Sequence, residues 1–128
     1  MRREAGGVRR KHHGLLAWEL SVQLVKRIYE LTHSFPTSEV YGLVSQMRRA
    51  AVSVPSNIAE GAARQSHREF VQFLVIARGS LSELETQLHI SRELGFTATE
   101  AAIDELIDRV FGLIGGLINA NRSESSDV

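Results

Sequence analysis

The side chains in this sequence that are best suited to a binding function are arginines in its middle third. Arg48 and Arg49 are adjacent, and Arg64 and Arg68 follow at a spacing of four residues. Few aromatic residues lie among them, which favours contacts to the phosphates of a nucleic acid over base stacking or base reading. Arg48 and Arg49 equally fit ion pairs with acids of the last helix or of another subunit. Arg64 equally fits an ion pair with Glu60, four residues before it.

The first 13 residues form a second basic element, with the sequence MRREAGGVRRKHH. Burial of so few apolar side chains cannot offset the entropy of ordering this leader, so we expect it to be flexible. Arg9, Arg10 and Lys11 are candidates for further phosphate contacts, whose affinity falls steeply as salt rises. The alternative is an inert leader. His12 and His13 are adjacent and lie on different faces of any helix, so they make a poor metal-binding pair.

Catalytic patterns are weak in this sequence. A di-metal carboxylate bundle needs a Glu-x-x-His motif on each of two helices, whereas Glu85 and His89 are four residues apart and the pattern occurs once. The chain has no His-Glu-x-x-His motif, no glycine-rich phosphate loop, no nucleophile elbow and no cysteine. We therefore expect a protein that is not an enzyme and that binds no metal or cofactor.

Composition places the chain among ordinary single-domain proteins, with 43% apolar and 23% charged residues. Its zero net charge hides an asymmetry: residues 1–78 carry 12 Lys/Arg and 6 Asp/Glu, whereas residues 79–128 carry 3 and 9. Such a distribution creates a basic face able to meet polyanions, or it reflects helices of opposite charge packed side by side. No apolar run approaches the roughly 20 residues that span a bilayer. Because cysteine is also absent, we expect a cytoplasmic protein without a membrane segment.

Apolar periodicity predicts an all-α chain of four helices. Ser66, followed by Glu69, is a capping-box pattern for the start of the third helix, and Gly95 is a good terminator for its end. The predicted helices run over residues 15–33, from 37 or 38 to between 61 and 63, over 67–94, and from about 97 or 99 to about 118. Residues 14–120 then form the bundle, between the leader 1–13 and a flexible polar tail over 121–128.

The third predicted helix carries a heptad repeat, and a period of about 3.5 residues is typical of a helix that packs one seam against other helices. The repeat consists of Phe70, Leu74, Ala77, Leu81, Leu84, Leu88 and Ser91. Small residues also occur inside the third and fourth helices, where they allow close packing of a neighbouring helix or an interface with another chain. They are Gly79, Ser80, Gly112 and Gly116.

Pro55 lies inside the second predicted helix. Because proline lacks an N–H, it cannot donate to the Ala51 carbonyl, and we expect a kink in the helix near this point. Asn57 and its serine neighbours are placed to satisfy the released backbone groups. Gly61 marks the point at which this helix begins to close.

Two stretches of the sequence indicate a known family, RRAAVSVPSNIAEG and SHREFVQFLVIARGSLSELETQL. Through them the chain resembles the four-helix bundle proteins encoded by intervening sequences of bacterial large-subunit ribosomal RNA genes. It is also similar to the accessory variability protein of diversity-generating retroelements. The resemblance covers about residues 17–118. Its most specific pieces are residues 48–49, 54–61, 79–81 and 83–85.

This resemblance implies an up-down-up-down antiparallel bundle that assembles as a homopentameric ring with a central pore. In the retroelement branch it also implies a basic surface that binds nucleic acid and a reverse transcriptase. The helices carry more apolar and small surface than one bundle needs, and a ring would bury the excess. The sequence therefore predicts a non-enzymatic homopentamer that binds RNA or DNA through backbone phosphates. The alternative is a scaffold that docks a partner enzyme, such as a reverse transcriptase, without contacting nucleic acid.

Overall fold

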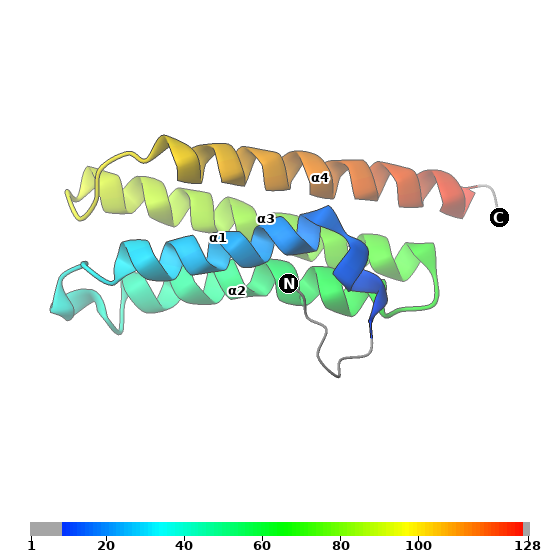
Figure 1. Cartoon of the computed structure of the whole chain (residues 1–128), viewed down its shortest axis with the longest axis horizontal. Coiled ribbons are helices and arrows are strands. Elements are labelled where there is room, and N and C mark those ends of the chain that lie inside the picture. The colour runs from blue at the N-terminus through cyan, green and yellow to red at the C-terminus, as the bar shows by residue number, and fades with distance from the viewer. Residues whose placement is uncertain (1–8, 127–128) are drawn as a thin grey trace.

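The computed structural model describes residues 9–126, which form helices joined by turns and short loops. Four long helices lie side by side, and successive helices run in opposite directions (Figure 1). They are α1 (Leu16–Thr32), α2 (Leu43–Ala62), α3 (His67–Glu93) and α4 (Ala101–Ser126), and two short 3-10 helices are η1 (Lys11–Gly14) and η2 (Thr37–Glu39). The prediction of an all-α four-helix bundle is confirmed. Its assembly into a ring stays a prediction.

The four helices pack in the cyclic order α1, α2, α3, α4, so that α4 also contacts α1. The α2–α3 contact is the most extensive and the α1–α4 contact is the least extensive. The α1–α2 and α3–α4 loops lie at one end of the bundle, and the α2–α3 turn lies at the other (Figure 1). Phe35 and Phe96 join the two loops at the first end, with ring centroids 5.7 Å apart.

The core of the bundle follows the predicted heptad repeat of α3. Every member of the repeat is buried, namely Phe70, Leu74, Ala77, Leu81, Leu84, Leu88 and Ser91. Helix α1 carries two apolar stripes, of which one enters the core through Leu24 and Ile28. Members of the other stripe stay outside, because Val22 and Tyr29 are 42% and 43% exposed. The chain alone therefore leaves part of its apolar surface uncovered.

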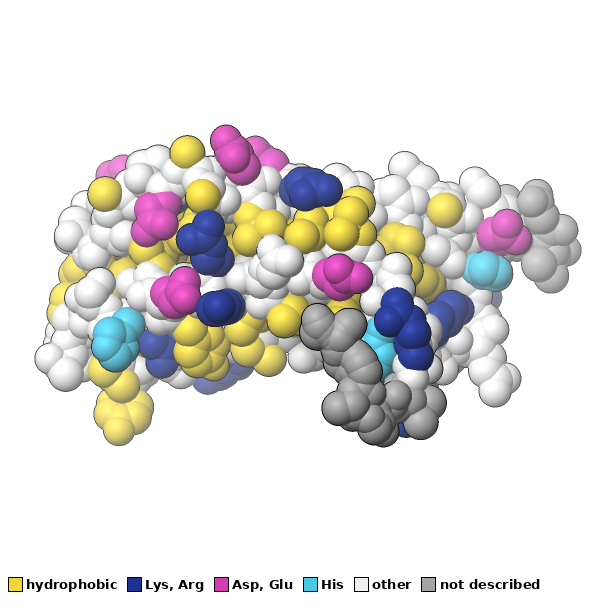
Figure 2. All heavy atoms as spheres, viewed as in Figure 1, with side chains coloured by type: hydrophobic (Ala, Val, Ile, Leu, Met, Phe, Trp, Pro, Cys, Tyr) yellow, Lys and Arg dark blue, Asp and Glu magenta, His cyan; other side chains and the backbone are white. Residues whose placement is uncertain are grey.

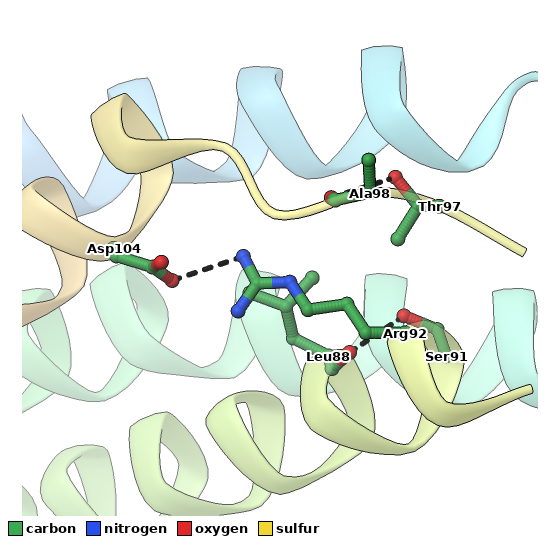
Figure 3. Close-up of polar contacts among 6 residues, drawn as sticks. All are labelled: Leu88, Ser91, Arg92, Thr97, Ala98 and Asp104. Carbon is green, nitrogen blue, oxygen red and sulfur yellow. Dashed lines mark hydrogen bonds and ion pairs between the residues drawn. The ribbon is translucent and has the colours of Figure 1, made fainter. Parts of the chain in front are cut away.

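The ends of α3 are set by the local signals that the sequence contains. The Ser66 hydroxyl accepts the Glu69 N–H at 3.1 Å, which satisfies one of the free donors of the first turn. At the other end, Gly95 has a φ of 78° and donates its N–H to the Arg92 carbonyl at 3.0 Å. The Arg92 guanidinium then reaches across to Asp104 of α4 at 3.0 Å (Figure 3). Both predicted ends of this helix are confirmed.

Helix α2 begins later than predicted, at Leu43 instead of Thr37 or Ser38. Residues 37–39 form the separate 3-10 helix η2, and a turn follows it. The Glu39 carboxylate accepts the Leu43 N–H at 3.3 Å. Glu39 thus satisfies one of the free N–H groups in the first turn of α2.

Helix α4 begins at Ala101 and continues to Ser126, past the predicted end of the bundle at residue 120. Near its end the Asn121 side-chain N–H donates to the Leu117 carbonyl at 2.8 Å, and Asn121 Oδ1 lies 2.6 Å from His67 Nδ1. These contacts hold the end of α4 against the start of α3. The predicted flexible leader and tail fall partly on residues 1–8 and 127–128, which lie outside the described residues, and their flexibility stays a prediction.

Helix α2 continues without interruption through Pro55, and a kink at this point stays a prediction. Ser56 Oγ donates to the Val52 carbonyl at 2.8 Å, and Asn57 Nδ2 donates to the Ser53 carbonyl at 2.8 Å. These two side chains therefore donate hydrogen bonds to the carbonyls of Val52 and Ser53, the residues that follow Ala51. Ser53 Oγ also lies 2.8 Å from Ser80 Oγ, which links α2 to α3 across their interface.

The predicted glycines differ in what surrounds them. A Cβ atom at Gly61 would lie 2.7 Å from Phe73 Cβ and 2.9 Å from Phe70 Cδ1, so α3 passes unusually close to α2 there. A Cβ atom at Gly79, Gly112 or Gly116 would meet no atom within 4 Å in the described part of the chain. The expectation that these three glycines allow close packing within the chain is therefore wrong, because each faces open space. A role at an interface between chains stays a prediction.

Candidate functional site

A groove of about 800 Å³ lies between α1 and α2, next to the loop that joins them. It is lined by the last turns of α1, the loop that contains η2, and the first half of α2. We call it the arginine–tyrosine groove, after the lining residues Tyr29, His33, Tyr41, Arg48 and Arg49. Of the described residues that line it, none is Asp or Glu. The fold thus gathers cationic and aromatic side chains that are far apart in the sequence.

Arg48 forms one wall of the groove and is held by α1. Its Nε donates to Thr32 Oγ1 at 3.0 Å and its Nη2 donates to the Tyr29 carbonyl at 3.4 Å. The guanidinium carbon also lies 4.4 Å from the centroid of the Tyr29 ring, within range of a cation–π interaction. The alternative of an ion pair between Arg48 and the last helix is therefore wrong, because its partners lie on α1. These bonds fix the guanidinium group in the groove wall.

Arg49 lies one residue further along α2 and is exposed. It lines the arginine–tyrosine groove and also a smaller pocket of about 140 Å³ between α2 and α3, which contains Ser53, Ser80 and Glu83. Within residues 9–126, no hydrogen bond or ion pair engages its guanidinium group. Its charge is thus available to a ligand.

Arg64 and Arg68 lie at the opposite end of the bundle, at the α2–α3 turn (Figure 1). Arg64 forms an ion pair with Glu60 at 2.9 Å and covers the Phe73 ring at 4.8 Å, so the predicted ion pair between these two residues is confirmed. Arg68 is exposed in the first turn of α3. About 20 Å of α2 separates this pair from Arg49. The structure therefore does not bring the four predicted arginines into one site.

The basic residues of the leader lie with the second group. Lys11 Nζ is 5.8 Å from the ring centroid of Phe70, in the first turn of α3, and Arg9 and Arg10 are exposed. Figure 2 shows Lys and Arg side chains gathered beside histidine near this end of α1. Elsewhere on that face, Lys/Arg and Asp/Glu side chains are interspersed with exposed hydrophobic ones. The face shown is thus mixed in charge and not uniformly basic.

His12 and His13 pack on Trp18 and do not face a common ligand. Their ring centroids lie 4.9 Å and 5.3 Å from the Trp18 ring. Burial lowers the pKa of His12 below its usual value, and the nearby charges of His13 and Arg10 lower it further. The lowered pKa disfavours the charged form of His12, so this histidine contributes less positive charge to this end of the bundle than a fully exposed one would.

A second groove, of about 280 Å³, lies between α1 and α4, which are the pair of adjacent helices with the least extensive contact. It is lined by residues 15–17, at the start of α1, and by Gly112, Leu113, Gly116 and Leu117 of α4. We call it the α1–α4 groove. No ionisable side chain is among the described residues that line it. Its chemistry suits an apolar partner.

Other site chemistries find little support in the part of the chain that the structure describes. There, no three His, Cys, Asp or Glu side chains lie together as metal ligands. No helix among the described residues combines the length and the apolar character that crossing a membrane requires. Two buried polar atoms, Gln87 Oε1 and Arg92 Nε, lack a hydrogen-bond partner there, and neither was predicted.

The chain was compared with known proteins and protein families. A family model described as "23S rRNA-intervening sequence protein" matches residues 13–118, which include the whole of α1, α2 and α3 and most of α4. The chain belongs to this family. A comparison with curated proteins finds no match. The likeness to the accessory variability protein of retroelements stays a prediction.

The residues matched by the family model include the arginine–tyrosine groove and leave out Arg9, Arg10 and Lys11. Sequence reasoning found Arg48 and Arg49 but missed Tyr29 and Tyr41, the aromatic residues beside them. Tyr29 is more than a dozen residues upstream on another helix, so its contact with Arg48 follows only from the packing of α1 on α2.

Proposed function

We propose that this protein is a non-enzymatic homopentamer that binds the phosphate backbone of RNA or DNA. The observation that carries the proposal is the arginine–tyrosine groove, which contains Arg48, Arg49 and His33 and is lined by no acid among the described residues. Cationic side chains that neutralise phosphates release condensed counterions, and this release drives binding to any nucleic acid. The unpaired guanidinium of Arg49 meets that requirement best.

Arg48 supports this function through its fixed position. Its bonds to Thr32 and Tyr29 use two of its N–H donors and leave others for a phosphate oxygen. A donor that is already ordered loses little conformational entropy when a ligand binds. Arg48 is nevertheless a poor target for a first test, because its removal also breaks contacts between α1 and α2.

Replacing Arg49 by alanine is expected to weaken the binding of a single-stranded RNA and to reduce the dependence of the binding constant on salt. Each phosphate contact contributes about 0.7 to the slope of log K against log salt for a single strand. Fluorescence anisotropy between roughly 50 and 300 mM salt measures both quantities. Arg49 is exposed, so circular dichroism should show unchanged helix content.

Arg109→Ala is the matched control for this experiment. Arg109 is exposed on α4, away from both groups of arginines, and its removal changes the net charge by the same amount. An equal loss of affinity in both variants would mean that only total charge matters, and it would contradict a site at the groove. The predicted contacts at the other end of the bundle stay predictions, namely Arg9, Arg10, Lys11, Arg64 and Arg68.

The pentameric part of the proposal rests on apolar surface that the single chain leaves exposed. The α1–α4 groove is one such surface, and Val75 and Ile76 of α3 are 38% and 51% exposed. A neighbouring chain packed on these surfaces would remove them from water, at about 25 cal/mol for each Å² of apolar area. Gly112 and Gly116 leave room for it, because neither has an atom near its missing side chain in the described structure.

Light scattering on protein stripped of nucleic acid, at low and at high salt, is expected to give five times the mass of one chain. Gly116→Arg should then reduce the mass, because it places a charged side chain in the α1–α4 groove at a position where a Cβ atom meets nothing within 4 Å in the described chain. A monomeric mass for the unaltered protein would contradict the ring.

The second candidate function is a scaffold that docks a partner enzyme, such as a reverse transcriptase, without contacting nucleic acid. The observation that favours it is the uncharged lining of the α1–α4 groove in the described structure, which suits a protein partner better than a phosphate backbone. Purified protein that ignores RNA from about 50 to 300 mM salt, yet co-purifies with the product of a neighbouring gene, would favour the scaffold.

A further inference from the structure

We infer that the arginine–tyrosine groove binds an unpaired nucleotide, with the base stacked on Tyr41 and the adjoining phosphate at Arg49. This inference rests on the proposed function and goes beyond it, because a backbone-binding site accepts duplex and single strand alike. Stacking on Tyr41 requires a base whose face is free. The protein would therefore prefer single-stranded nucleic acid at this site.

The exposure of Tyr41 is the first observation behind the inference. Its side chain is 98% exposed, whereas every other exposed large apolar side chain in the described structure is at most 58% exposed. Packing within the described chain thus gives no reason for an aromatic residue at this position. Both faces of the ring are accessible, and a nucleic-acid base stacks on such a ring whatever its sequence.

Tyr41 is also held on an ordered turn. The Val40 N–H donates to the Thr37 carbonyl at 3.2 Å, and the Gly42 N–H donates to the Glu39 carbonyl at 3.0 Å. These bonds flank the tyrosine on both sides and tie its backbone to η2. The backbone that carries the ring is thus ordered before the ligand arrives, which removes the backbone part of the entropic cost of binding.

The charge and size of the groove indicate which ligand the ring receives. Tyr41 lines the same groove as Arg48, Arg49 and His33, and the groove contains no acid among the described residues. Its volume of about 800 Å³ lies within the range of sites that hold small organic ligands. The complementary ligand is thus aromatic and anionic, a combination that every nucleotide of a single strand provides. In a duplex the base faces are stacked on one another and cannot reach Tyr41.

Tyr29 cannot take the same role. The Arg48 guanidinium lies 4.4 Å from the centroid of its ring and occupies one of its faces. Tyr29 therefore supports the groove by holding Arg48, and Tyr41 is left as the stacking surface.

The test compares a single-stranded oligonucleotide of uridines or thymidines with a duplex of equal length. Tyr41→Ala is expected to lower the affinity for the single strand by about 5- to 100-fold, because one stacked base is lost. The slope of log K against log salt and the affinity for the duplex should stay unchanged. Tyr41→Phe keeps the ring and should retain the affinity. Since Tyr41 is almost fully exposed, neither variant should affect folding.

Arg49→Ala, measured beside them, separates this inference from the proposed function. Loss of affinity in Arg49→Ala with no change in Tyr41→Ala would overturn the stacking inference and leave backbone binding intact. An equal loss of single-strand and duplex affinity in Tyr41→Ala would also overturn it. An unaltered protein that binds neither ligand would overturn the proposed function itself. The uridine and thymidine arms distinguish RNA from DNA as the source of the base.

A spectroscopic readout supplements the affinities. In Tyr41→Trp, stacking of a base on the new indole should quench its fluorescence when the single strand is added. The unaltered protein, whose one tryptophan is Trp18 on α1, provides the reference signal. Quenching by the duplex to the same extent would count against stacking.

Discussion

Replacing Gly61 by alanine is expected to lower the free energy of unfolding by about 1–3 kcal/mol, although alanine forms helices better than glycine does. The reason is the close approach of α3, which would place the new methyl group 2.7 Å from Phe73 Cβ and 2.9 Å from Phe70 Cδ1. Phe73 Cβ is attached directly to the backbone and cannot rotate away. The two helices must therefore move apart at this point.

Gly79→Ala is the matched control, because the same substitution there meets no atom within 4 Å among the described residues. Alanine removes the entropic disadvantage of glycine inside α3, so this variant should be more stable by about 0.5–1 kcal/mol. Urea unfolding followed by circular dichroism, at equal oligomeric mass, gives both values. A stabilising effect at Gly61 would show that α2 and α3 are not in close contact there.

Leu81→Ala is expected to have a still larger effect, a loss of about 2–5 kcal/mol in the free energy of unfolding. Leu81 is fully buried at the centre of the α3 seam, so truncation removes hydrophobic burial and leaves a cavity. A domain of this size is stable by about 5–15 kcal/mol. The variant should therefore unfold at a clearly lower urea concentration, with the same method of measurement.

Leu94→Ala provides the comparison for this variant at the end of the same helix. Leu94 is 58% exposed, and its truncation should change the stability by no more than about 0.5 kcal/mol. Similar losses at both positions would contradict the burial of the seam and place α3 in a different orientation.

The parts of the fold that could be predicted are those fixed by short-range signals. The seam of α3 follows from a spacing of apolar residues that needs no knowledge of the partner helices. Its ends follow from Ser66 and Gly95, which act on the backbone next to them. The family match agrees with the stretches on which the resemblance was based.

The errors arose where a residue's role depends on what faces it. The second helix was predicted to start at residue 37 or 38, but these residues form η2, and the Glu39 carboxylate accepts the Leu43 N–H where α2 begins. Gly79 and Gly112 are small in the same way as Gly61, yet of these three only Gly61 has another helix against it in the described structure. A sequence shows that glycine lacks a side chain. It does not show whether another helix occupies the space that this leaves.

The candidate site was predictable only in part for the same reason. Arg48 and Arg49 are neighbours in the sequence, but the structure gives them different tasks, since α1 engages one and leaves the other free. The importance of Tyr41 depends on its exposure, and no periodic pattern reports the exposure of a residue in a turn. The sequence favoured phosphate contacts over base stacking because few aromatic residues lie among the arginines. That prediction did not take Tyr41 into account.

The hydroxyl pair of Ser53 and Ser80 limits how α2 can slide along α3. An apolar seam repeats every heptad, so a shift by one repeat would still bury apolar side chains of α2 against the seam of α3. The same shift would separate the two hydroxyls, which lie 2.8 Å apart, and would also leave Asn57 Nδ2, 3.0 Å from Ser53 Oγ, beside an unpaired group. The cost of unpaired polar atoms in a partly buried interface falls on every alignment except one. These few polar atoms thus select a single axial alignment from the set that the apolar seam permits.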